Sequence, residues 1–376
     1  MKITSAHPSI TKKEINNVYQ AMQNGWGKRM SYYIESFSKK FSEYLGIKYC
    51  LPVAHCTDAI HLALLSLGIK KGDEVIVPDL TWVASVSPVK YVGAKPIFVD
   101  IDKDSLCIDH TKLQNKITKK TKAIISVNLF GNVSNNIEIK KICKKNKIYL
   151  IEDSAESLGA SLKNRMAGSF GDISLFSFNA TKLIMSGQGG CLCTNNKKIY
   201  EKAKLYSHHG IDKKKTGKYY WSNVLGYNYN WTNIQAACAL AQLSRINNLL
   251  KYKRKIYYLY KKYFSNIKNV EITKKNNDQN QTYWIVYAII KKKINKEKFC
   301  EKFKKYNIDM RPMFYQISSM PPFRSPKDIK NNKIANYISK NGVCLPNGYN
   351  LNENKIKKIA STFNLILNKK SEILKI

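Results

Sequence analysis

The chain has 376 residues, of which 44% are hydrophobic, and its 64 Lys and Arg against 26 Asp and Glu give a net charge of +38. A chain of this length buries a large core and is expected to form two domains. No apolar run is long enough to span a bilayer, and the N-terminus lacks the apolar core of a signal peptide, so we expect a cytoplasmic protein with no membrane partner.

The cysteines also favour a cytoplasmic protein. There are nine of them, an odd number, and they form no Cys-x-x-Cys pair, which is typical of reduced thiols. Cys191 and Cys193 would share one face of a strand, but no residue nearby in the sequence completes a metal site, so we expect no metal.

The positive charge raises the alternative of a basic, non-catalytic nucleic-acid-binding protein. The lysines are spread along the chain and accompany abundant Asn and Ile, which indicates a compositional bias, and the runs at 213–215 and 291–293 are short. No nucleic-acid-binding motif accompanies these runs. We therefore expect no nucleic-acid partner, although a positive field would favour an anionic substrate such as a sugar nucleotide.

Short apolar runs alternate with amphipathic segments through the first two-thirds of the chain, which is typical of an α/β layer fold. Strands are expected at residues 48–53, 74–78, 95–99, 123–127, 148–151, 172–177 and 190–194. Helices are expected at 59–67, from Thr81 onward, around 137–142 and, as one long segment that leaves the first domain, at 232–264.

The last third of the chain predicts a smaller α/β domain. Its expected elements are a strand at 283–287, a helix at 296–306 and a strand that ends at 313–314. We therefore assign residues 1–245 to a large cofactor-binding domain and residues 246–376 to a small C-terminal domain.

Polar residues follow several of the expected strands, namely Thr57, Thr81, Asp153 and Ser177. Ligands of open α/β sheets bind at the carboxyl ends of the strands, so these side chains are expected on one rim. Helix capping would explain Thr57 and Thr81 equally well, but not Asp153. The N–H groups at the helix start around Thr57 and Asp58 are a candidate site for a phosphate.

The strongest single signal is the segment Ser177–Lys182, followed by Ser186–Gly190. A lysine on a tight polar turn, with the carboxylate of Asp153 at the end of a preceding strand, is what pyridoxal phosphate chemistry requires. The lysine holds the cofactor as a Schiff base and moves a proton, and the carboxylate keeps the ring nitrogen protonated. By base rates alone Lys182 would be a solvated surface lysine, so the inference depends on its neighbours.

Four segments together carry a resemblance to a known family: Gly72–Pro78, Glu152–Gly159, Ser177–Lys182 and Gly226–Asn230. In this order and spacing they resemble the DegT/DnrJ/EryC1/StrS sugar aminotransferases, which are fold-type I pyridoxal phosphate enzymes, and the resemblance covers nearly the whole chain. It implies a large, mostly parallel sheet domain with helices on both faces, a smaller C-terminal α/β domain, and pyridoxal 5'-phosphate as the cofactor.

The resemblance also implies roles for individual residues. Lys182 would bond the cofactor covalently, and Asp153 would pair with the ring nitrogen. Ser177 would hold the cofactor phosphate with its hydroxyl group, beside the backbone of Thr57 and Asp58. Dehydratases of the same fold carry histidine in place of Lys182, so the lysine favours amino transfer.

Further roles follow from the same resemblance. Trp82 matches the aromatic residue that stacks on the cofactor ring, although without the family a core tryptophan would be the preferred interpretation. Glu156 occupies a position near the ring. Asn228 matches an asparagine that reaches the phosphate of the neighbouring subunit, which implies a homodimer with shared active sites. Arg311 and Tyr315 match substrate-binding positions.

The expected reaction is transfer of an amino group from glutamate to C4 of a nucleotide-linked 4-keto-6-deoxy sugar. Glu156 and the segment 311–315 are similar to the perosamine-forming branch of the family, so GDP-4-keto-6-deoxymannose giving GDP-perosamine is the preferred reaction. A UDP- or dTDP-linked sugar is the alternative. Asn230 and Ser318 stand where the family often has Arg and His, which leaves the sugar and the nucleotide open.

Overall fold

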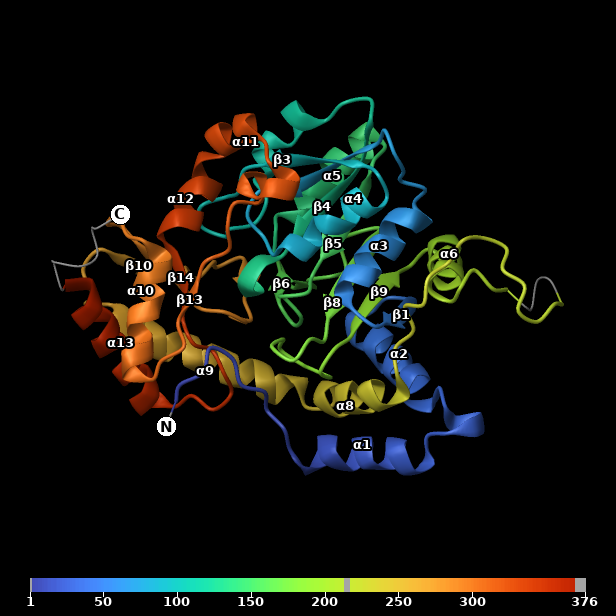
Figure 1. Ribbon diagram of the computed structural model, residues 1–376, viewed down its shortest axis with the longest axis horizontal. Helices are drawn as coiled ribbons and strands as arrows, with labels where there is room; N and C mark the ends of the chain where they lie inside the picture. Colours follow the sequence, from blue (N-terminus) through green and yellow to red (C-terminus); the bar gives the residue numbers. More distant parts are fainter. Residues whose placement is uncertain (1, 213–216, 369–376) are drawn as a thin grey trace.

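The computed structural model describes residues 2–212 and 217–368 (Figure 1). Its centre is a seven-stranded sheet with the strand order β1-β9-β8-β5-β4-β2-β3. Neighbouring strands run parallel except for β9, which is antiparallel to both β1 and β8. The strands are β1 (Tyr49–Val53), β2 (Glu74–Pro78), β3 (Lys95–Val99), β4 (Thr121–Val127), β5 (Tyr149–Asp153), β8 (Ile173–Ser177) and β9 (Gly190–Thr194). Each of them overlaps a strand expected from the sequence.

Helices surround this sheet. They are α1 (Lys12–Asn24), α2 (Tyr32–Leu45), α3 (Cys56–Ser66), α4 (Ser87–Tyr91), α5 (Asn136–Asn146), α6 (Lys197–Ser207) and α8 (Asn233–Leu243). Single 3-10 turns occupy Gly27–Arg29, Val83–Ser85, His110–Lys112, Gln114–Lys116 and Leu129–Gly131.

The sheet is buried on both faces because successive side chains of a strand point to opposite sides. Val75 and Val77 of β2 pack in one apolar cluster with Ile60 of α3. Ile76, between them, packs in another cluster with Ile139 of α5. The continuous apolar run of β2 is therefore covered from two sides, as is usual for a parallel strand. The expected architecture, a mostly parallel sheet with helices on both faces, is confirmed.

Two helix starts differ from the expectation. Helix α3 already begins at Cys56, because His55 has the extended backbone of an N-cap, with φ of −146°. Thr81 does not begin an α-helix. It precedes a 3-10 turn, and α4 starts only at Ser87, where Pro88 falls in the first turn and needs no hydrogen-bond acceptor for an N–H group.

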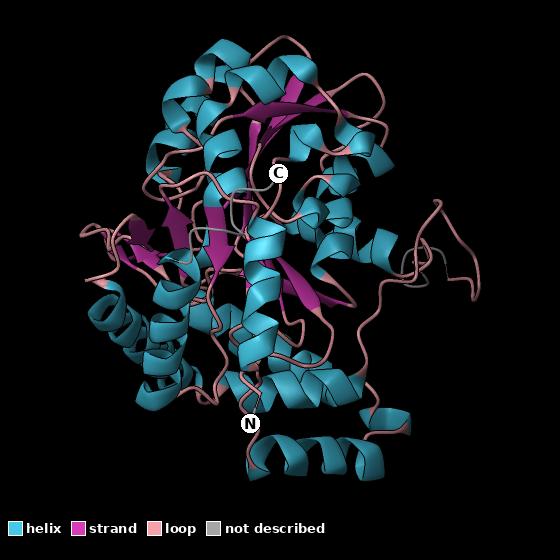
Figure 2. Cartoon of the chain, turned by 60° about the vertical axis from the view of Figure 1, so that its left-hand side comes forward, coloured by secondary structure: helices cyan, strands magenta, loops and turns pink. Residues whose placement is uncertain are grey.

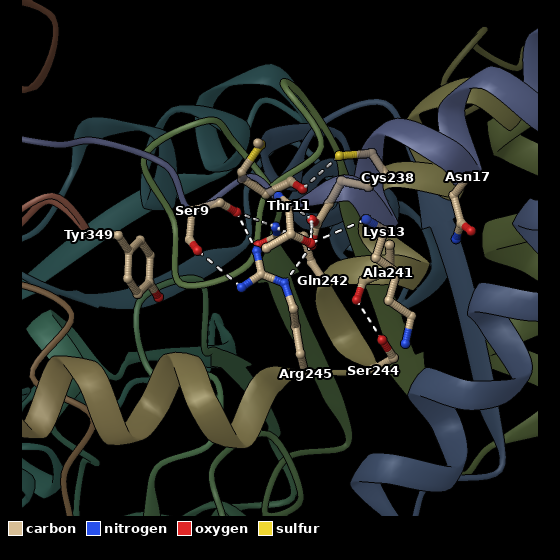
Figure 3. A network of polar contacts seen from close by, with 12 residues as sticks. Ser9, Thr11, Lys13, Asn17, Cys238, Ala241, Gln242, Ser244, Arg245 and Tyr349 are labelled. Atoms are coloured by element: carbon tan, nitrogen blue, oxygen red, sulfur yellow. Dashed lines mark hydrogen bonds and ion pairs between the residues drawn. The ribbon is translucent and has the colours of Figure 1, made fainter.

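The segment expected as one helix at 232–264 is two helices, α8 and α9 (Ile246–Phe264), so that expectation is wrong. The break falls at Arg245, whose backbone is non-helical, with φ of −124° and ψ of 22°. Its side chain binds the N-terminal segment (Figure 3): Nε donates to Glu14 Oε1 at 2.6 Å and Nη1 donates to Ser9 Oγ at 3.0 Å. Apolar periodicity does not reveal such a break, since its cause lies more than 200 residues earlier in the chain.

A second, four-stranded sheet has the order β10-β12-β14-β13, with every pair antiparallel. Helices α9, α10 and α13 pack against it around Tyr260, Phe299 and Phe363 (Figures 1 and 2). The elements are β10 (Val270–Ile272), β12 (Tyr287–Ile290), α10 (Lys296–Lys302), β13 (Arg311–Pro312), α11 (Pro326–Asn331), α12 (Lys333–Asn341), β14 (Gly342–Cys344) and α13 (Glu353–Asn368), with 3-10 turns at Phe303–Tyr306, Ile317–Ser319 and Pro321–Phe323.

A small three-stranded sheet completes the fold. Its strands are β6 (Ser161–Leu162), β7 (Arg165–Met166) and β11 (Gln279–Asn280), in the order β11-β6-β7. Within residues 2–212 and 217–368, no helix is both long enough and apolar enough to cross a membrane.

The strand expected at 283–287 is misplaced, because β12 begins only at Tyr287. Tyr283 has a φ of 51°, which lies outside the strand region. The Nδ2 atom of Asn347 donates to the carbonyl oxygens of Tyr283 at 2.7 Å and Trp284 at 2.6 Å, so a side-chain amide occupies acceptors that a sheet would use. The helix expected at 296–306 is α10 followed by a 3-10 turn.

The first residues of the chain pack with this second sheet. Ile3 pairs with Ile308 in a parallel bridge and is buried in the same core. The N–H of Asn347 donates to the carbonyl oxygen of Ser5, at 2.9 Å. The division of the chain at residue 245 stays a prediction, and residues 3–7 lie on the C-terminal side of the molecule.

Candidate active site

A cavity of about 620 Å³ lies where the carboxyl ends of the large sheet face the second sheet. Most of the site residues expected from the sequence line it: Thr57, Trp82, Asp153, Glu156, Ser177, Lys182, Arg311 and Tyr315. Ser5 and Ala6 from the N-terminal segment line it as well.

Lys182 lies in the turn that follows β8, where its N–H donates to the carbonyl oxygen of Asn179 at 2.9 Å. Its Nζ donates to Glu156 Oε1 at 3.3 Å and lies 3.8 Å from the centre of the Trp284 ring. The indole Nε1 of Trp284 in turn donates to the carbonyl oxygen of Thr181 at 2.8 Å. A carboxylate and an aromatic face therefore hold this amine in the cavity, unlike the solvated lysines of a protein surface.

Asp153 ends β5 and is buried. Its Oδ2 accepts from Ser85 Oγ at 2.7 Å, and its Oδ1 accepts from the N–H of Ala155 at 3.1 Å. Burial raises the pKa of Asp153, while these two hydrogen bonds and the charge of Lys182 oppose that rise. Thr81 lies behind this arrangement, with its Oγ1 3.2 Å from Ser85 Oγ. Thus Asp153 is a fixed, poorly solvated carboxyl group that can share a proton with a basic ring nitrogen.

Glu156 connects the lysine to the backbone after β4. Its Oε2 accepts from the N–H of Phe130 at 3.1 Å, while its Oε1 faces Lys182. Phe130 has a φ of 55°, so a bend of the chain aims its N–H at the carboxylate. Burial raises the pKa of Glu156, and the charge of Lys182 counteracts that rise. This carboxyl group can hold the ammonium of Lys182 or exchange a proton with it.

The N-terminus of α3 faces the same cavity. His55 is its N-cap residue, and its side chain makes no hydrogen bond to the backbone N–H groups of the first turn. Cys56 and Thr57 line the cavity. The first N–H groups of a helix bind anions such as phosphate. Gly190 keeps space open here, since a Cβ at this residue would lie 2.4 Å from the Cys56 nitrogen. Together with Ser177, these groups fit the phosphate of a phosphorylated cofactor.

The side chains of two of the expected cofactor residues have other partners. Asp58 Oδ2 pairs with His55 Nδ1 at 3.0 Å, and burial raises the pKa of Asp58. Asn228 bridges His208 through its backbone, and its Oδ1 accepts from Asn230 Nδ2 at 3.0 Å. Neither Asp58 nor Asn228 lines the cavity of its own chain.

Other side chains of the cavity wall are more exposed. Trp82, which follows β2 of the large sheet, is 56% exposed, so it is not a core tryptophan. Arg311 Nη2 pairs with Asp309 Oδ2 at 3.1 Å, and the hydroxyl group of Tyr315 donates to Glu297 Oε1 at 2.5 Å. Arg311 and Tyr315 thus add charge and aromatic surface to the cavity wall on the side of the second sheet.

Sequence reasoning missed Trp284, Lys253 and Asn347, which also line the cavity. The only usable signal concerns Lys253, which interrupts the apolar face of α9 four residues after Leu249. Ser318 stands where a substrate-binding His was considered, but it is fully buried and donates its hydroxyl hydrogen to an aspartate.

The structure also brings a third thiol to Cys191 and Cys193. Cys50 of β1 pairs directly with Cys193 of β9, and the three Sγ atoms lie within 4.8 Å of one another in the core. Sequence spacing does not reveal this cluster, because Cys50 is distant along the chain.

Comparisons with known proteins agree with this geometry. The model of the DegT/DnrJ/EryC1/StrS aminotransferase family matches residues 8–364. The chain is 37% identical to the GDP-perosamine synthase of Escherichia coli O157:H7, over 95% of this chain and 96% of that protein. It is 32% identical to the GDP-perosamine synthase of Vibrio cholerae, over 94% and 96%. Among solved structures, a putative sugar aminotransferase from Streptococcus pneumoniae in its PMP-form superposes with a TM-score of 0.90 at 26% identity, covering 97% of this chain and 98% of that one.

Proposed function

Since this chain belongs to the DegT/DnrJ/EryC1/StrS aminotransferase family and is a pyridoxal-phosphate-dependent aminotransferase, we propose that it transfers an amino group from glutamate to C4 of GDP-4-keto-6-deoxymannose, giving GDP-perosamine. The observation that carries the proposal is the single cavity in which Lys182, Glu156 and Asp153 meet. The substrate is supported by the nearly full-length similarity to two proteins named GDP-perosamine synthase.

The donor groups of the cavity fit pyridoxal phosphate. The uncapped start of α3 at Thr57 and the hydroxyl group of Ser177 suit the phosphate. The carboxyl group of Asp153 suits the ring nitrogen, and the exposed indole of Trp82 suits the face of the ring. When bound, the cofactor supplies an aldehyde that receives the amino group and a ring that stores the electron pair released at the donor carbon.

The protein contributes the proton transfers. Lys182 Nζ takes the proton from the α-carbon of glutamate in the first half-reaction and supplies the proton that C4 of the sugar gains in the second. Glu156, 3.3 Å from this nitrogen, keeps the amine in the cavity and stabilises its charged form. Asp153, held by Ser85, keeps a proton on the ring nitrogen.

The substrate proposal is tested with a panel of GDP-, UDP- and dTDP-linked 4-keto-6-deoxy sugars. Each sugar is incubated with the purified protein, pyridoxal phosphate and glutamate, and 2-oxoglutarate is measured, with Lys182→Ala as the inactive control. We expect kcat/KM for the GDP sugar to exceed the others by about tenfold or more, a discrimination of roughly 1.4 kcal/mol. Faster turnover of a UDP or dTDP sugar would assign the enzyme to another substrate.

We also propose a homodimer in which Asn228 serves the partner's phosphate site. Asn228 lies outside the cavity of its own chain. After α6 the chain extends from the body of the molecule (Figure 1). Tyr220 is 93% exposed and Leu225 is 85% exposed in this segment, and aromatic residues are enriched in interface cores.

The shared site is tested by mixing two inactive variants, Lys182→Ala and Asn228→Asp, under conditions that allow subunit exchange. A mixed dimer would contain one site with both defects and one intact site, so activity reappears. Absence of recovery after demonstrated exchange would mean that Asn228 does not serve the partner. We further propose that the enzyme works in the cytoplasm, where its nine free thiols stay reduced, and that its product enters O-antigen or other polysaccharide biosynthesis.

A further inference from the structure

The cavity contains a second lysine that the proposed reaction does not use. Lys253 lies on the buried face of α9, between Leu249 and Ile256, and is only 3% exposed. It nevertheless lines the cavity that contains Lys182. A lysine on the apolar face of a helix is unusual, because burial of an ammonium group costs free energy unless it is compensated.

The polar surroundings of this ammonium are incomplete. Among the described residues, Lys253 Nζ donates to the carbonyl oxygen of Asn347 and lies 4.6 Å from the centre of the Tyr349 ring. An ammonium group has three hydrogen atoms to donate. Burial lowers the pKa of Lys253 to about 7, and no carboxylate opposes this effect. The group can therefore gain a counter-ion.

The other basic side chains of the cavity wall each have a carboxylate as counter-ion. The pairs are Lys182 with Glu156 at 3.3 Å, Arg311 with Asp309 at 3.1 Å and His55 with Asp58 at 3.0 Å. Of the described basic side chains that line the cavity, Lys253 is left without a carboxylate. Because the protein supplies none, a ligand is the remaining source of negative charge.

Lys296 illustrates a buried lysine with a purely structural role. It is 4% exposed, and its Nζ donates to two carbonyl oxygens, of Met313 at 2.8 Å and Ser339 at 2.7 Å. Unlike Lys253, it does not line the cavity. Its Nζ also lies 3.8 Å from the centre of the Tyr315 ring, much as Lys253 lies over Tyr349. Burial and contact with a tyrosine ring are therefore common to both lysines, and the cavity position distinguishes Lys253.

Asn347 connects Lys253 to the reacting amine. Its carbonyl oxygen accepts from Lys253, and its side-chain Nδ2 holds the backbone of Tyr283 and Trp284. The ring of Trp284 faces Lys182 Nζ. The Oδ1 atom of Asn347 is buried and has no hydrogen-bond partner among the described residues. A second polar atom of this wall is thus also unsatisfied.

We propose that Lys253 binds a substrate oxyanion, either a carboxylate of the amino donor or a phosphate of the nucleotide. The assignment rests on the proposed aminotransferase function, in which both substrates are anions that react in this cavity. An oxyanion beside Nζ takes the place of the missing counter-ion, and a charge-assisted hydrogen bond in a buried site is strong.

The test compares variants that separate charge from structure. Lys253→Gln keeps a donor for the Asn347 carbonyl but loses the charge, and Lys253→Met keeps the stem without either property. Tyr260→Phe is the matched control, since the Tyr260 hydroxyl group ties the same helix α9 to the neighbouring carbonyl of Pro346 at 2.6 Å without lining the cavity.

Two assays identify the source of the anion. The glutamate half-reaction is followed by cofactor absorbance at varied glutamate, and binding of GDP alone to the holoenzyme is measured by calorimetry. We expect Lys253→Gln and Lys253→Met to raise either the KM for glutamate or the Kd for GDP by about tenfold or more. The kcat should stay within about threefold of the value for the original enzyme. Tyr260→Phe should lower the melting temperature and leave both constants unchanged.

Unchanged constants in Lys253→Gln would overturn the proposal, as would equal losses in Lys253→Gln and Tyr260→Phe, because the lysine would then only brace the loop. Lys253→Met decides the question if the Gln variant does not fold. Failure of the proposed function would look different. The original enzyme would then aminate no nucleotide sugar, while its half-reaction with glutamate could still reveal the effect of the Lys253 variants.

Discussion

The two walls of the cavity are built in different ways. On the large-sheet side, Asp153 and Glu156 are buried and the Lys182 side chain is only 13% exposed, and each forms a hydrogen bond with a separate part of the chain. On the opposite side, the Arg311 side chain is 64% exposed and Tyr315 is 47% exposed. The first wall restricts its side chains to one geometry, whereas the second leaves them free to adapt.

This difference indicates a division of work. Proton transfer requires fixed distances, so the buried wall is suited to chemistry. Exposed, long side chains lose little by moving, so the opposite wall is suited to contact with the variable part of a substrate. Substitutions on the first wall should therefore lower kcat, and those on the second should raise KM.

The largest effect is expected for Lys182→Ala. Losing Nζ removes the group that moves the proton, and we expect kcat to fall by roughly 10³-fold or more. The fold, checked by circular dichroism, should be retained together with some non-covalent cofactor binding. Near-normal formation of 2-oxoglutarate by the variant would refute the proposal that the large-sheet wall carries out the proton transfer.

Asp153→Asn should lower kcat by about 100-fold, because an amide does not keep the ring nitrogen protonated. If Asp153 were only a cap, worth about 1 kcal/mol, Asn would replace it well and activity would persist.

The same variant tests the pKa of Asp153, which burial raises. The folded protein then binds more protons than the unfolded chain, so the stability of the cofactor-free protein falls as pH rises above about 4. Asn does not titrate. We therefore expect the cofactor-free variant to melt at an equal or higher temperature than the original at pH 8, with a flatter pH dependence. A lower melting temperature at pH 8 would contradict this.

A smaller loss is expected for Glu156→Gln. The amide still accepts from the N–H of Phe130, but it no longer stabilises the charge of Lys182, and we expect kcat to fall by about tenfold with little change in KM. Burial raises the pKa of Glu156, so activity of the original enzyme should decline as pH drops through that pKa. The pH–rate profile of the variant should lack this decline, and an unchanged acid limb would exclude Glu156 as its origin.

The smallest effect is expected for Arg311→Ala. Its pairing with Asp309 is exposed and contributes little stability, so the melting temperature should change by about 1 °C or less. We expect KM for the nucleotide sugar to rise by about five- to tenfold while kcat stays within about twofold. A loss concentrated in kcat would mean that the two walls do not divide the work in this way.

How far the sequence predicts this site depends on where each residue acquires its role. Lys182 and Asp153 lie at strand ends within short polar segments, so local pattern and spacing identify them. Trp284 and Lys253 become part of the site only through packing between distant elements. Local pattern places the first in a strand, and it marks the second only as a lysine that interrupts the apolar face of a helix. The break at Arg245 has the same origin, because its partners are near the N-terminus.

The N-terminal segment has a consequence for protein engineering. Ser5 and Ala6 line the cavity, and Ile3 pairs with Ile308, so the adaptable wall is assembled from two stretches far apart in the chain. Consider a chimera that takes the chain after Arg245 from a relative, in order to exchange the nucleotide preference. Its cavity would combine the relative's C-terminal residues with the N-terminal segment of this protein. Transplanting specificity intact therefore requires a second junction, just after His7.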